Sequence, residues 1–296
     1  MERDKQVIIV RGGGDIATGT ISKLHHCGYP VLVLESQTPT AIRRHVAFSE
    51  AVYEGQSQVE DVTCKLADSM VANPMGVNPM ESVQGIWREG KVAMMVDPDC
   101  RVLKVCRPWA LVDAILAKRN LGTGRHMAPK TVALGPGFVA GRDVDAVIET
   151  MRGHNLGRII WEGSALPNTG VPGIINGHGK DRVIHAPADG VLHACCRIGD
   201  FVNQGQIIAW ITREGQQPVG VEASLTGLLR GLIRDGFGVK KGLKIADIDP
   251  RKSEYENCFT ISDKARCIAG SVLEALQQME YLSYAGGEKM HKGKEW

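Results

Sequence analysis

The chain has 296 residues, of which 43% are hydrophobic and 23% charged, the balance of an ordinary globular protein of about two domains. A formal net charge of +2 gives no basic footprint for a nucleic acid or a membrane surface, and no apolar window reaches the roughly 18 residues of a membrane span. Eight cysteines without paired spacing are typical of reduced thiols, so we expect a cytoplasmic protein.

The N-terminal segment predicts a strand, a glycine turn, a helix and a second strand. The apolar run at residues 7–10 enters the turn at residues 11–14, and a helical pattern then stops at Gly28. A second apolar run, at residues 31–34, ends in Glu35. This order is half of a Rossmann unit.

The glycine turn suits a nucleotide or dinucleotide ligand. Gly12 allows the tight turn, Gly14 lets backbone N–H groups approach a diphosphate, and Ala17 is small enough for close helix–strand packing. Glu35 can accept hydrogen bonds from ribose hydroxyls, while Asp15 places a negative charge close to the expected diphosphate. The predicted contacts are Gly12, Gly13, Gly14, Asp15, Ile16, Ala17 and Glu35.

Two other features are candidates for the same site. Arg43 and Arg44 follow the second strand and could bind phosphate, although such a pair is more often a solvated face. Gly135 and Gly137 form a loop directly after the predicted strand at residues 131–134, where open parallel sheets place their ligands. The alternative for these glycines is simple punctuation between elements.

The remaining elements of the first half alternate between helix and strand. Helices are predicted at residues 59–70 and 111–119 and a strand at residues 91–96, with a short helix capped by Thr38 before Pro39. We therefore expect an α/β fold in which residues 1–184 form a Rossmann-like, nucleotide-binding parallel sheet.

Residues 185–251 change character and contain an internal repeat. Residues 186–211 return as residues 223–248 after a shift of 37 positions, with glycines and apolar residues in matching places. The pattern resembles the barrel-sandwich hybrid of biotinyl and lipoyl carrier domains. The connection at residues 212–219 contains no lysine, so we expect neither biotin nor lipoate.

Residues 252–296 predict a final helix that packs back on the first domain, followed by a frayed tail at residues 286–296. Thr260 and Asp263 are a possible capping pair. An apolar stripe recurs at three- and four-residue intervals, at Ile261, Ala265, Ile268, Val272, Leu276 and Met279.

Several longer segments carry a family resemblance. Over nearly its whole length the chain resembles the YqeB-type family of the selenium-dependent molybdenum hydroxylase system, and its N-terminal region resembles the Rossmann domain of XdhC-type accessory proteins. The segments that carry the resemblance are residues 11–19, 112–120, 135–141, 147–154 and 168–173, together with the repeat region up to Arg251.

The resemblance implies an accessory role in the maturation of a molybdenum hydroxylase similar to xanthine dehydrogenase. That role includes cofactor insertion or the addition of sulfur or selenium, with the client hydroxylase as partner. The dinucleotide form of molybdenum cofactor carries the diphosphate and ribose that the glycine turn and Glu35 suit, but NAD or FAD would fit equally. Glu35 opposes the 2′-phosphate of NADP.

Sulfur or selenium transfer would require an exposed thiol of lowered pKa. Cys100 and Cys106 flank a basic stretch and are the candidates, although free cysteines are mostly buried apolar residues. No cysteine or histidine spacing indicates a metal site. The rival class is an NAD-dependent oxidoreductase, but the sequence contains no Tyr-x-x-x-Lys pair. The sequence leaves open whether the chain forms a homo-oligomer.

Overall fold

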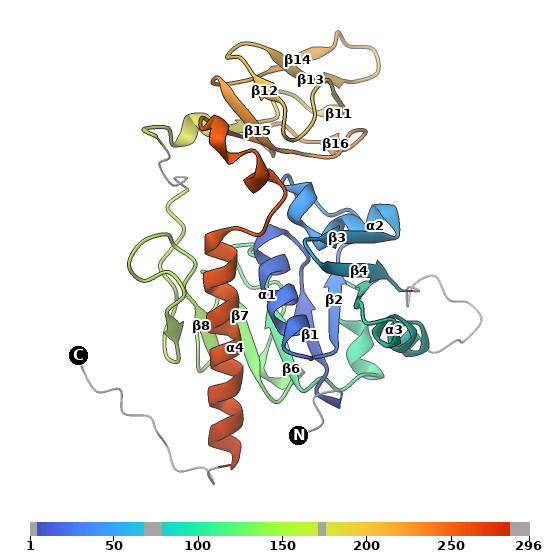
Figure 1. Ribbon diagram of the computed structural model, residues 1–296, viewed down its shortest axis with the longest axis vertical. Coiled ribbons are helices and arrows are strands. Elements are labelled where there is room, and N and C mark those ends of the chain that lie inside the picture. The colour runs from blue at the N-terminus through green and yellow to red at the C-terminus, as the bar shows by residue number, and fades with distance from the viewer. Residues whose placement is uncertain (1–4, 68–78, 171–175, 285–296) are drawn as a thin grey trace.

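A nine-stranded sheet forms the larger part of the molecule, and two four-stranded sheets form a smaller β part above it (Figure 1). This computed structural model describes residues 5–67, 79–170 and 176–284. The predicted tail at residues 286–296 lies outside the described residues.

The large sheet is mixed. Every neighbouring pair from β4 to β8 is parallel, whereas the edge strands β3 and β9 are antiparallel to their neighbours. In sheet order its strands are β3 (Gln56–Val59), β4 (Val62–Leu66), β5 (Val92–Val96), β2 (Val31–Glu35), β1 (Ile8–Arg11), β6 (Ala110–Asp113), β7 (Thr131–Leu134), β8 (Ala146–Ile148) and β9 (Ile159–Ile160).

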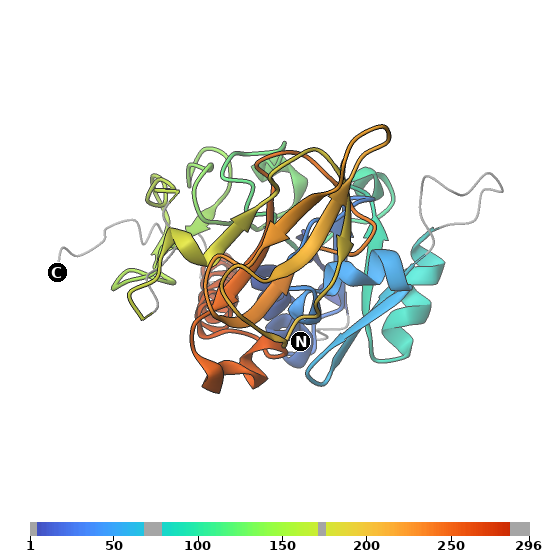
Figure 2. The same ribbon diagram turned by 90° about the horizontal axis from the view of Figure 1, so that it is seen from above.

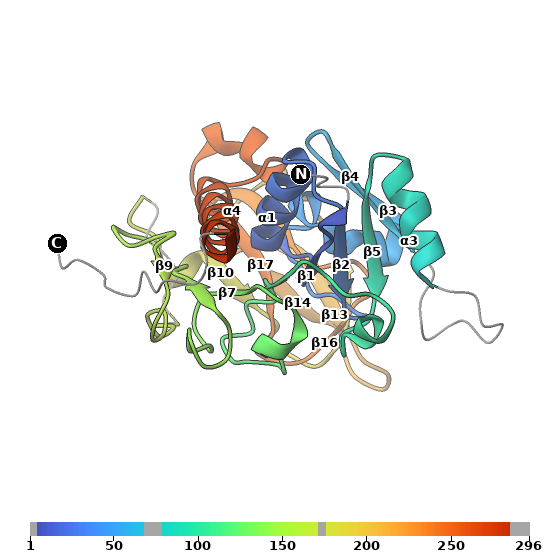
Figure 3. The same ribbon diagram turned by 90° about the horizontal axis from the view of Figure 1, so that it is seen from below.

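Helices cover both faces of the large sheet, so its central strands are apolar on both sides. In β1, Ile8 and Val10 belong to the core that contains α1 (Asp15–His26) and α4 (Asp263–Tyr284), whereas Ile9 belongs to the core beneath α3 (Pro79–Arg88). Figure 3 shows α1 and α4 side by side, away from α3. Shorter helical segments are α2 (Ala51–Glu54) and the 3-10 helices Arg44–Val46, Phe48–Glu50, Arg101–Lys104, Arg125–Met127, Lys180–Arg182, Lys252–Glu254 and Glu256–Cys258.

Helix α4 packs tightly against α1. At Gly19 of α1, an added Cβ would lie 2.8 Å from the Cβ of Ala265, so the absence of a side chain allows the close approach. Ser262 caps the helix, because its Oγ accepts a 3.2 Å hydrogen bond from the N–H of Ala265, and the predicted cap at Thr260 is wrong. The buried face of α4 contains the predicted Ala265, Ile268, Val272 and Leu276.

The smaller β part consists of two antiparallel sheets over one apolar core (Figure 2). One sheet contains β10 (Val183–His185), β17 (Lys244–Asp249), β15 (Gly227–Leu232) and β12 (Phe201–Val202), in that order. The other contains β14 (Val219–Glu222), β13 (Ile207–Thr212), β11 (Gly190–Ala194) and β16 (Gly238–Val239). Each sheet combines strands from both repeats.

The predicted fold class, a Rossmann-like parallel sheet followed by a barrel-sandwich hybrid, is wrong. The large sheet is mixed, and the small part is a pair of separate four-stranded sheets. Residues 59–66, predicted as helix, form most of the β3–β4 hairpin, and the helix predicted at residues 111–119 is strand β6 followed by a loop. Short apolar runs fit a buried strand as well as a buried helix, so periodicity alone does not separate them. The short helix predicted to begin at Pro39 is also wrong, because the structure of this described segment has no helix there.

Polar contacts join the small β part to the large sheet. The N–H of Leu232 donates to the carbonyl of Ile42 at 2.8 Å, and Nε of Arg44 donates to the carbonyl of Leu232 at 2.8 Å. The predicted domain limits, at residues 184/185 and 251/252, stay predictions. Within the described residues, no helix is both long enough and apolar enough to cross a membrane.

Candidate functional site

The glycine turn follows β1 and requires glycine at position 12. Gly12 has φ +92°, and an added Cβ there would lie 3.0 Å from the Cα of Ile115 and 3.1 Å from the carbonyl oxygen of Ala114. Gly14, by contrast, faces open space, because an added Cβ would meet no atom within 4 Å. Helix α1 starts at the next residue, and no side chain caps it.

A cavity of about 590 Å³ lies beside this turn, and we call it the glycine-turn cavity. It is formed at the carboxyl ends of β1, β2, β5 and β6. From β1 the chain moves to β2 on one side of the sheet and later to β6 on the other, so the cavity lies where the strand order reverses. Its lining includes Gly12, Gly14, Leu34, Glu35, Ser36, Ser49, Pro98, Asp99, Ala114 and Leu121.

Glu35 reaches the cavity, but its carboxylate folds back on the protein backbone. One oxygen accepts a 2.8 Å hydrogen bond from the N–H of Gly13, and the other accepts a 2.7 Å bond from the N–H of Ser36. Each carboxylate oxygen keeps a further lone pair for a ligand hydroxyl. Glu35 therefore holds the glycine turn in place, and its role with ribose hydroxyls stays a prediction.

A buried arginine that the sequence analysis missed supports the floor of the cavity. Arg11 donates to the carbonyl of Pro98 at 2.9 Å and to that of Leu121 at 3.3 Å, and it pairs with Asp113 at 3.5 Å. Burial raises the pKa of Asp113, although hydrogen bonding to Thr123 and the charge of Arg11 oppose the change. The sequence did contain a signal for this pair. Arg11 and Asp113 each end an apolar run and carry opposite charges, and the two strands that they end, β1 and β6, are neighbours in the sheet.

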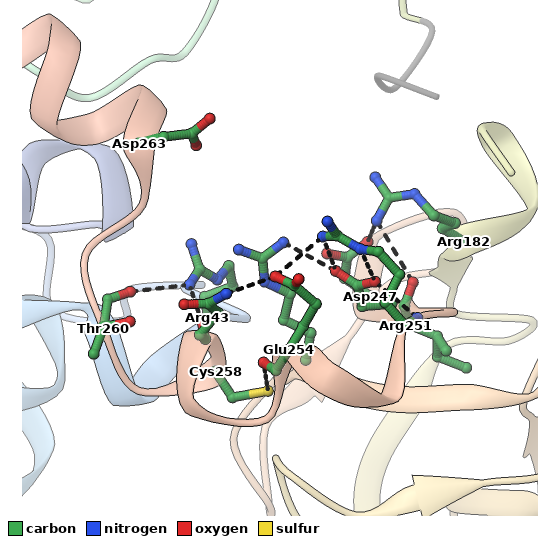
Figure 4. Close-up of polar contacts among 12 residues, drawn as sticks. Arg43, Arg182, Asp247, Arg251, Glu254, Cys258, Thr260 and Asp263 are labelled. Atoms are coloured by element: carbon green, nitrogen blue, oxygen red, sulfur yellow. Dashed lines mark hydrogen bonds and ion pairs between the residues drawn. The ribbon is translucent and has the colours of Figure 1, made fainter. Parts of the chain in front are cut away.

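A second cavity, of about 550 Å³, lies on the other side of the first turn of α1, and we call it the arginine cleft. Three predicted ligand contacts, Asp15, Ile16 and Arg43, line this cleft rather than the glycine-turn cavity. Arg43 pairs with Asp15 at 3.4 Å, so the acidic charge that the sequence placed near a diphosphate is partly neutralised. Figure 4 shows Arg43 near Arg182 and Arg251, whose partners Asp247 and Glu254 are labelled.

The other five predicted contacts line neither cavity. Gly13 lies within the turn itself, and an added Cβ there would be 3.0 Å from the backbone nitrogen of Ser49. Ala17 is fully buried in the core beneath α1. Arg44 binds Leu232 and Glu50 at the junction with the small β part. Gly135 and Gly137 have positive φ and allow close backbone approach, because an added Cβ at Gly137 would lie 2.6 Å from the Cα of Arg119.

The thiols named as sulfur carriers are buried. Cys100 and Cys106 are 4% and 7% exposed. Burial raises the pKa of the Cys100 thiol to about 11 and also raises the pKa of Cys106, the opposite of what thiolate chemistry requires. The exposed cysteines are Cys195 and Cys267. Within the described part of the chain, no group of three or more His, Cys, Asp or Glu residues could hold a metal ion.

No protein-family model matches the chain. Solved structures that align with it include the ectoine utilization protein EutE from Ruegeria pomeroyi, with bound product (14% identity, TM-score 0.26, 83% of this chain and 85% of that chain). An aspartoacylase family protein from Mesorhizobium loti aligns with 12% identity and a TM-score of 0.29, over 83% of this chain and 85% of that chain. Likenesses this weak define no class for the chain.

One curated relative is much more similar in sequence. The chain is 48% identical over 274 residues to "Uncharacterized protein YqeB" of Escherichia coli (strain K12). The alignment covers 93% of this chain and 48% of the relative, so the chain spans about half the length of the curated relative it matches. The predicted resemblance to YqeB is confirmed, and that name carries no activity.

Proposed function

We propose that the protein is an accessory factor in the maturation of a molybdenum hydroxylase and that it holds a dinucleotide-type ligand in the glycine-turn cavity. The resemblance of the long sequence segments supports the accessory role. The observation that carries the ligand proposal is the position of the cavity. In open sheets of parallel strands, ligands bind outside the carboxyl ends of the strands at the point where strand order reverses.

The residues of the cavity fit the nucleotide portion of such a ligand. The uncapped start of α1 at Gly14 suits a phosphate, because the N-terminus of a helix carries partial positive charge and free N–H groups. Glu35 retains acceptor capacity for ribose hydroxyls, and its charge disfavours a 2′-phosphate. The hydroxyl of Ser49 is buried with no hydrogen-bond partner and belongs to a residue of the cavity wall, so a ligand would supply one.

The ligand proposal can be tested by native mass spectrometry of protein produced with molybdate and selenite available. Gly14→Asp should abolish retention of a nucleotide-bearing ligand, since the new carboxylate would stand where the phosphate binds. Gly270→Asp on α4, a position with no atom within 4 Å of an added Cβ, is the matched control and should retain the ligand. A molybdopterin species lost only in Gly14→Asp supports the accessory role.

Other outcomes would redirect the proposal. NAD or FAD retained in place of a molybdopterin favours the alternative, an NAD-dependent oxidoreductase. Protein that retains no nucleotide under any condition contradicts the ligand proposal. The accessory role itself requires that hydroxylase activity fall in cells lacking the protein, and unchanged activity would contradict it.

A further inference from the structure

The arginine cleft carries a surplus of positive charge. Seven arginine and lysine side chains and four carboxylates line it, a surplus of three. The buried carboxylate of Asp249, beneath Arg230 and Arg251, reduces the surplus to two. The cations come from segments that follow strands of the large sheet, from the small β part with the segments beside it and from the start of α4, at Arg43, Arg152, Arg182, Arg230, Lys244, Arg251 and Lys264.

The carboxylates leave some of these cations incompletely paired. Asp249 binds Arg251 through two side-chain hydrogen bonds, at 2.9 and 2.8 Å, and Asp263 is held by the exposed Arg152 at 3.1 Å. Lys264 is half-buried, and among the described residues its ammonium has no hydrogen bond or ion pair. Burial, and then the charge of Arg152, lower the pKa of Lys264.

Arg43 is one of the two most enclosed cations of the cleft, together with Arg182. It is only 9% exposed, and its guanidinium donates to the carbonyls of Asn257 at 3.0 Å and Thr260 at 3.4 Å (Figure 4). The Nε–H groups of Arg43 and of Arg230 are buried and have no hydrogen-bond partner. Burial, and then the charge of Arg230, lower the pKa of Arg43. Buried donors without acceptors, crowded with like charges, are stabilised by an anion between them.

Two helices also begin in the wall of the cleft. Asp15 and Ile16 belong to the first turn of α1, and Asp263 and Lys264 to the first turn of α4. Helix N-termini favour anions through their partial positive charge and their free N–H groups. The helices add to the attraction that the arginines exert.

We propose that the arginine cleft binds a diphosphate group, carried either by free pyrophosphate or by a phosphorylated small molecule, with Arg43, Arg230 and Lys264 as its principal contacts. The charge of a diphosphate matches a surplus of two to three, which a monophosphate would leave partly uncompensated. Guanidinium groups suit phosphate oxygens because they donate two parallel hydrogen bonds. The cleft lies across the first turn of α1 from the glycine-turn cavity, so it is a second site that goes beyond the proposed function.

Isothermal titration calorimetry with pyrophosphate tests the proposal on the intact chain. Lys264→Met and Arg230→Gln should each bind pyrophosphate roughly tenfold or more weakly than the unaltered protein. Lys264→Met should leave the melting temperature unchanged or raise it, because the variant removes a cation that has no partner. An unchanged or raised melting temperature then shows that misfolding does not cause the loss of affinity in Lys264→Met. Lys23→Met, on the exposed surface of α1, is the matched control and should bind pyrophosphate normally.

Further probes identify the source of the diphosphate. Tighter binding of cytidine diphosphate than of pyrophosphate assigns the site to a phosphorylated small molecule, and the reverse assigns it to free pyrophosphate. Inorganic phosphate that binds as tightly as pyrophosphate overturns the assignment of a diphosphate. Absence of pyrophosphate binding overturns the site itself, and so does binding by Lys264→Met and Arg230→Gln that is as tight as binding by the unaltered protein. Dinucleotide retention by Lys264→Met, measured by native mass spectrometry, shows whether the glycine-turn cavity works independently.

Discussion

Asp249 is the fully buried carboxylate at the end of β17, and its arginine partners belong to the arginine cleft. Arg251 donates to both of its oxygens, and Arg230 pairs with it at 3.4 Å. Burial alone would raise the pKa of Asp249, but the hydrogen bonds from Arg251 lower it. The carboxylate is therefore charged and holds two cations in place.

Replacing this carboxylate should be costly. We expect Asp249→Asn to lower the free energy of unfolding by about 3 kcal/mol, the lower end of the range for breaking a buried pair, because Arg251 is partly exposed. Urea denaturation measures the change. Asp99→Asn is the control, since Asp99 also pairs with an arginine two positions on, at 3.1 Å, but on the surface. The control should change stability by less than about 0.5 kcal/mol, and equal losses in both variants would contradict the role of burial.

Sequence proximity decided which parts of the glycine-turn cavity could be predicted. Gly12, Gly14 and Glu35 lie in one strand–helix–strand stretch, so their common position follows from local structure. The bonds of Arg11 to Asp113 and Thr123 join residues 102 and 112 positions apart, and no local pattern predicts them. The arginine cleft was missed for the same reason, because its cations come from distant segments.

At the scale of elements, burial on both faces explains the error at residues 110–113. The strands at residues 31–34, 91–96 and 131–134 were predicted nearly to the residue, since β-branched runs bounded by turns are a strong signal. The segment Ala110–Asp113 has no polar alternation because both of its faces are buried, and the helix predicted from residue 111 was wrong. Beyond it, Leu116 and Lys118 have positive φ, a backbone conformation that no helix contains.

The close contact between α1 and α4 predicts how a substitution at Gly19 changes stability. A Gly-to-Ala change within a helix usually stabilises it, but a Cβ at Gly19 would lie 2.8 Å from the Cβ and 2.9 Å from the carbonyl oxygen of Ala265. We expect Gly19→Ala to lower the free energy of unfolding by about 1–3 kcal/mol because of overpacking. Chemical denaturation monitored by circular dichroism measures it.

The control for this prediction lies on the partner helix. Gly270 of α4 has open space at its Cβ position, so Gly270→Ala should raise the free energy of unfolding by about 0.5–1 kcal/mol. Opposite signs in the two variants are the expected result. A stabilising effect of Gly19→Ala would mean that the two helices are not packed as closely as described.

At the scale of the whole molecule, a polar junction joins the core of the small β part to the large part. The core of the small β part includes Ile42 of the large part at its margin, and Ile42 bonds to Leu232 through the backbone. Arg234 of the small part reaches Glu50 and Glu54 of the large part and lies over the ring of Tyr53. Because these contacts join residues about 180 positions apart, the sequence predicted two regions but not the junction between them.

The junction should give the molecule a pH dependence that can be assigned to Glu50. Glu50 is 8% exposed and pairs with Arg234 at 3.3 Å and Arg44 at 3.7 Å. Burial raises the pKa of Glu50 above its ordinary value of 4.5, and the two arginines offset only part of this change. The folded state therefore binds more protons at this carboxyl than the unfolded chain does. Its stabilising contribution is complete below about pH 4.5 and is lost as the pH rises through the folded-state pKa.

We therefore expect Glu50→Gln to gain stability relative to the unaltered protein between about pH 4 and about pH 7, because the variant has no carboxyl to ionise in the junction. Urea denaturation of both proteins at the two pH values gives the difference in unfolding free energy, in which the other titrating groups cancel. Glu54→Gln removes an exposed carboxylate that pairs with the same Arg234, so it separates the effect of burial from the loss of an ion pair. Two results would show that water reaches Glu50 in the junction. One is a stability of Glu50→Gln, relative to the unaltered protein, that stays constant or falls as the pH rises. The other is the same pH trend in Glu50→Gln and Glu54→Gln.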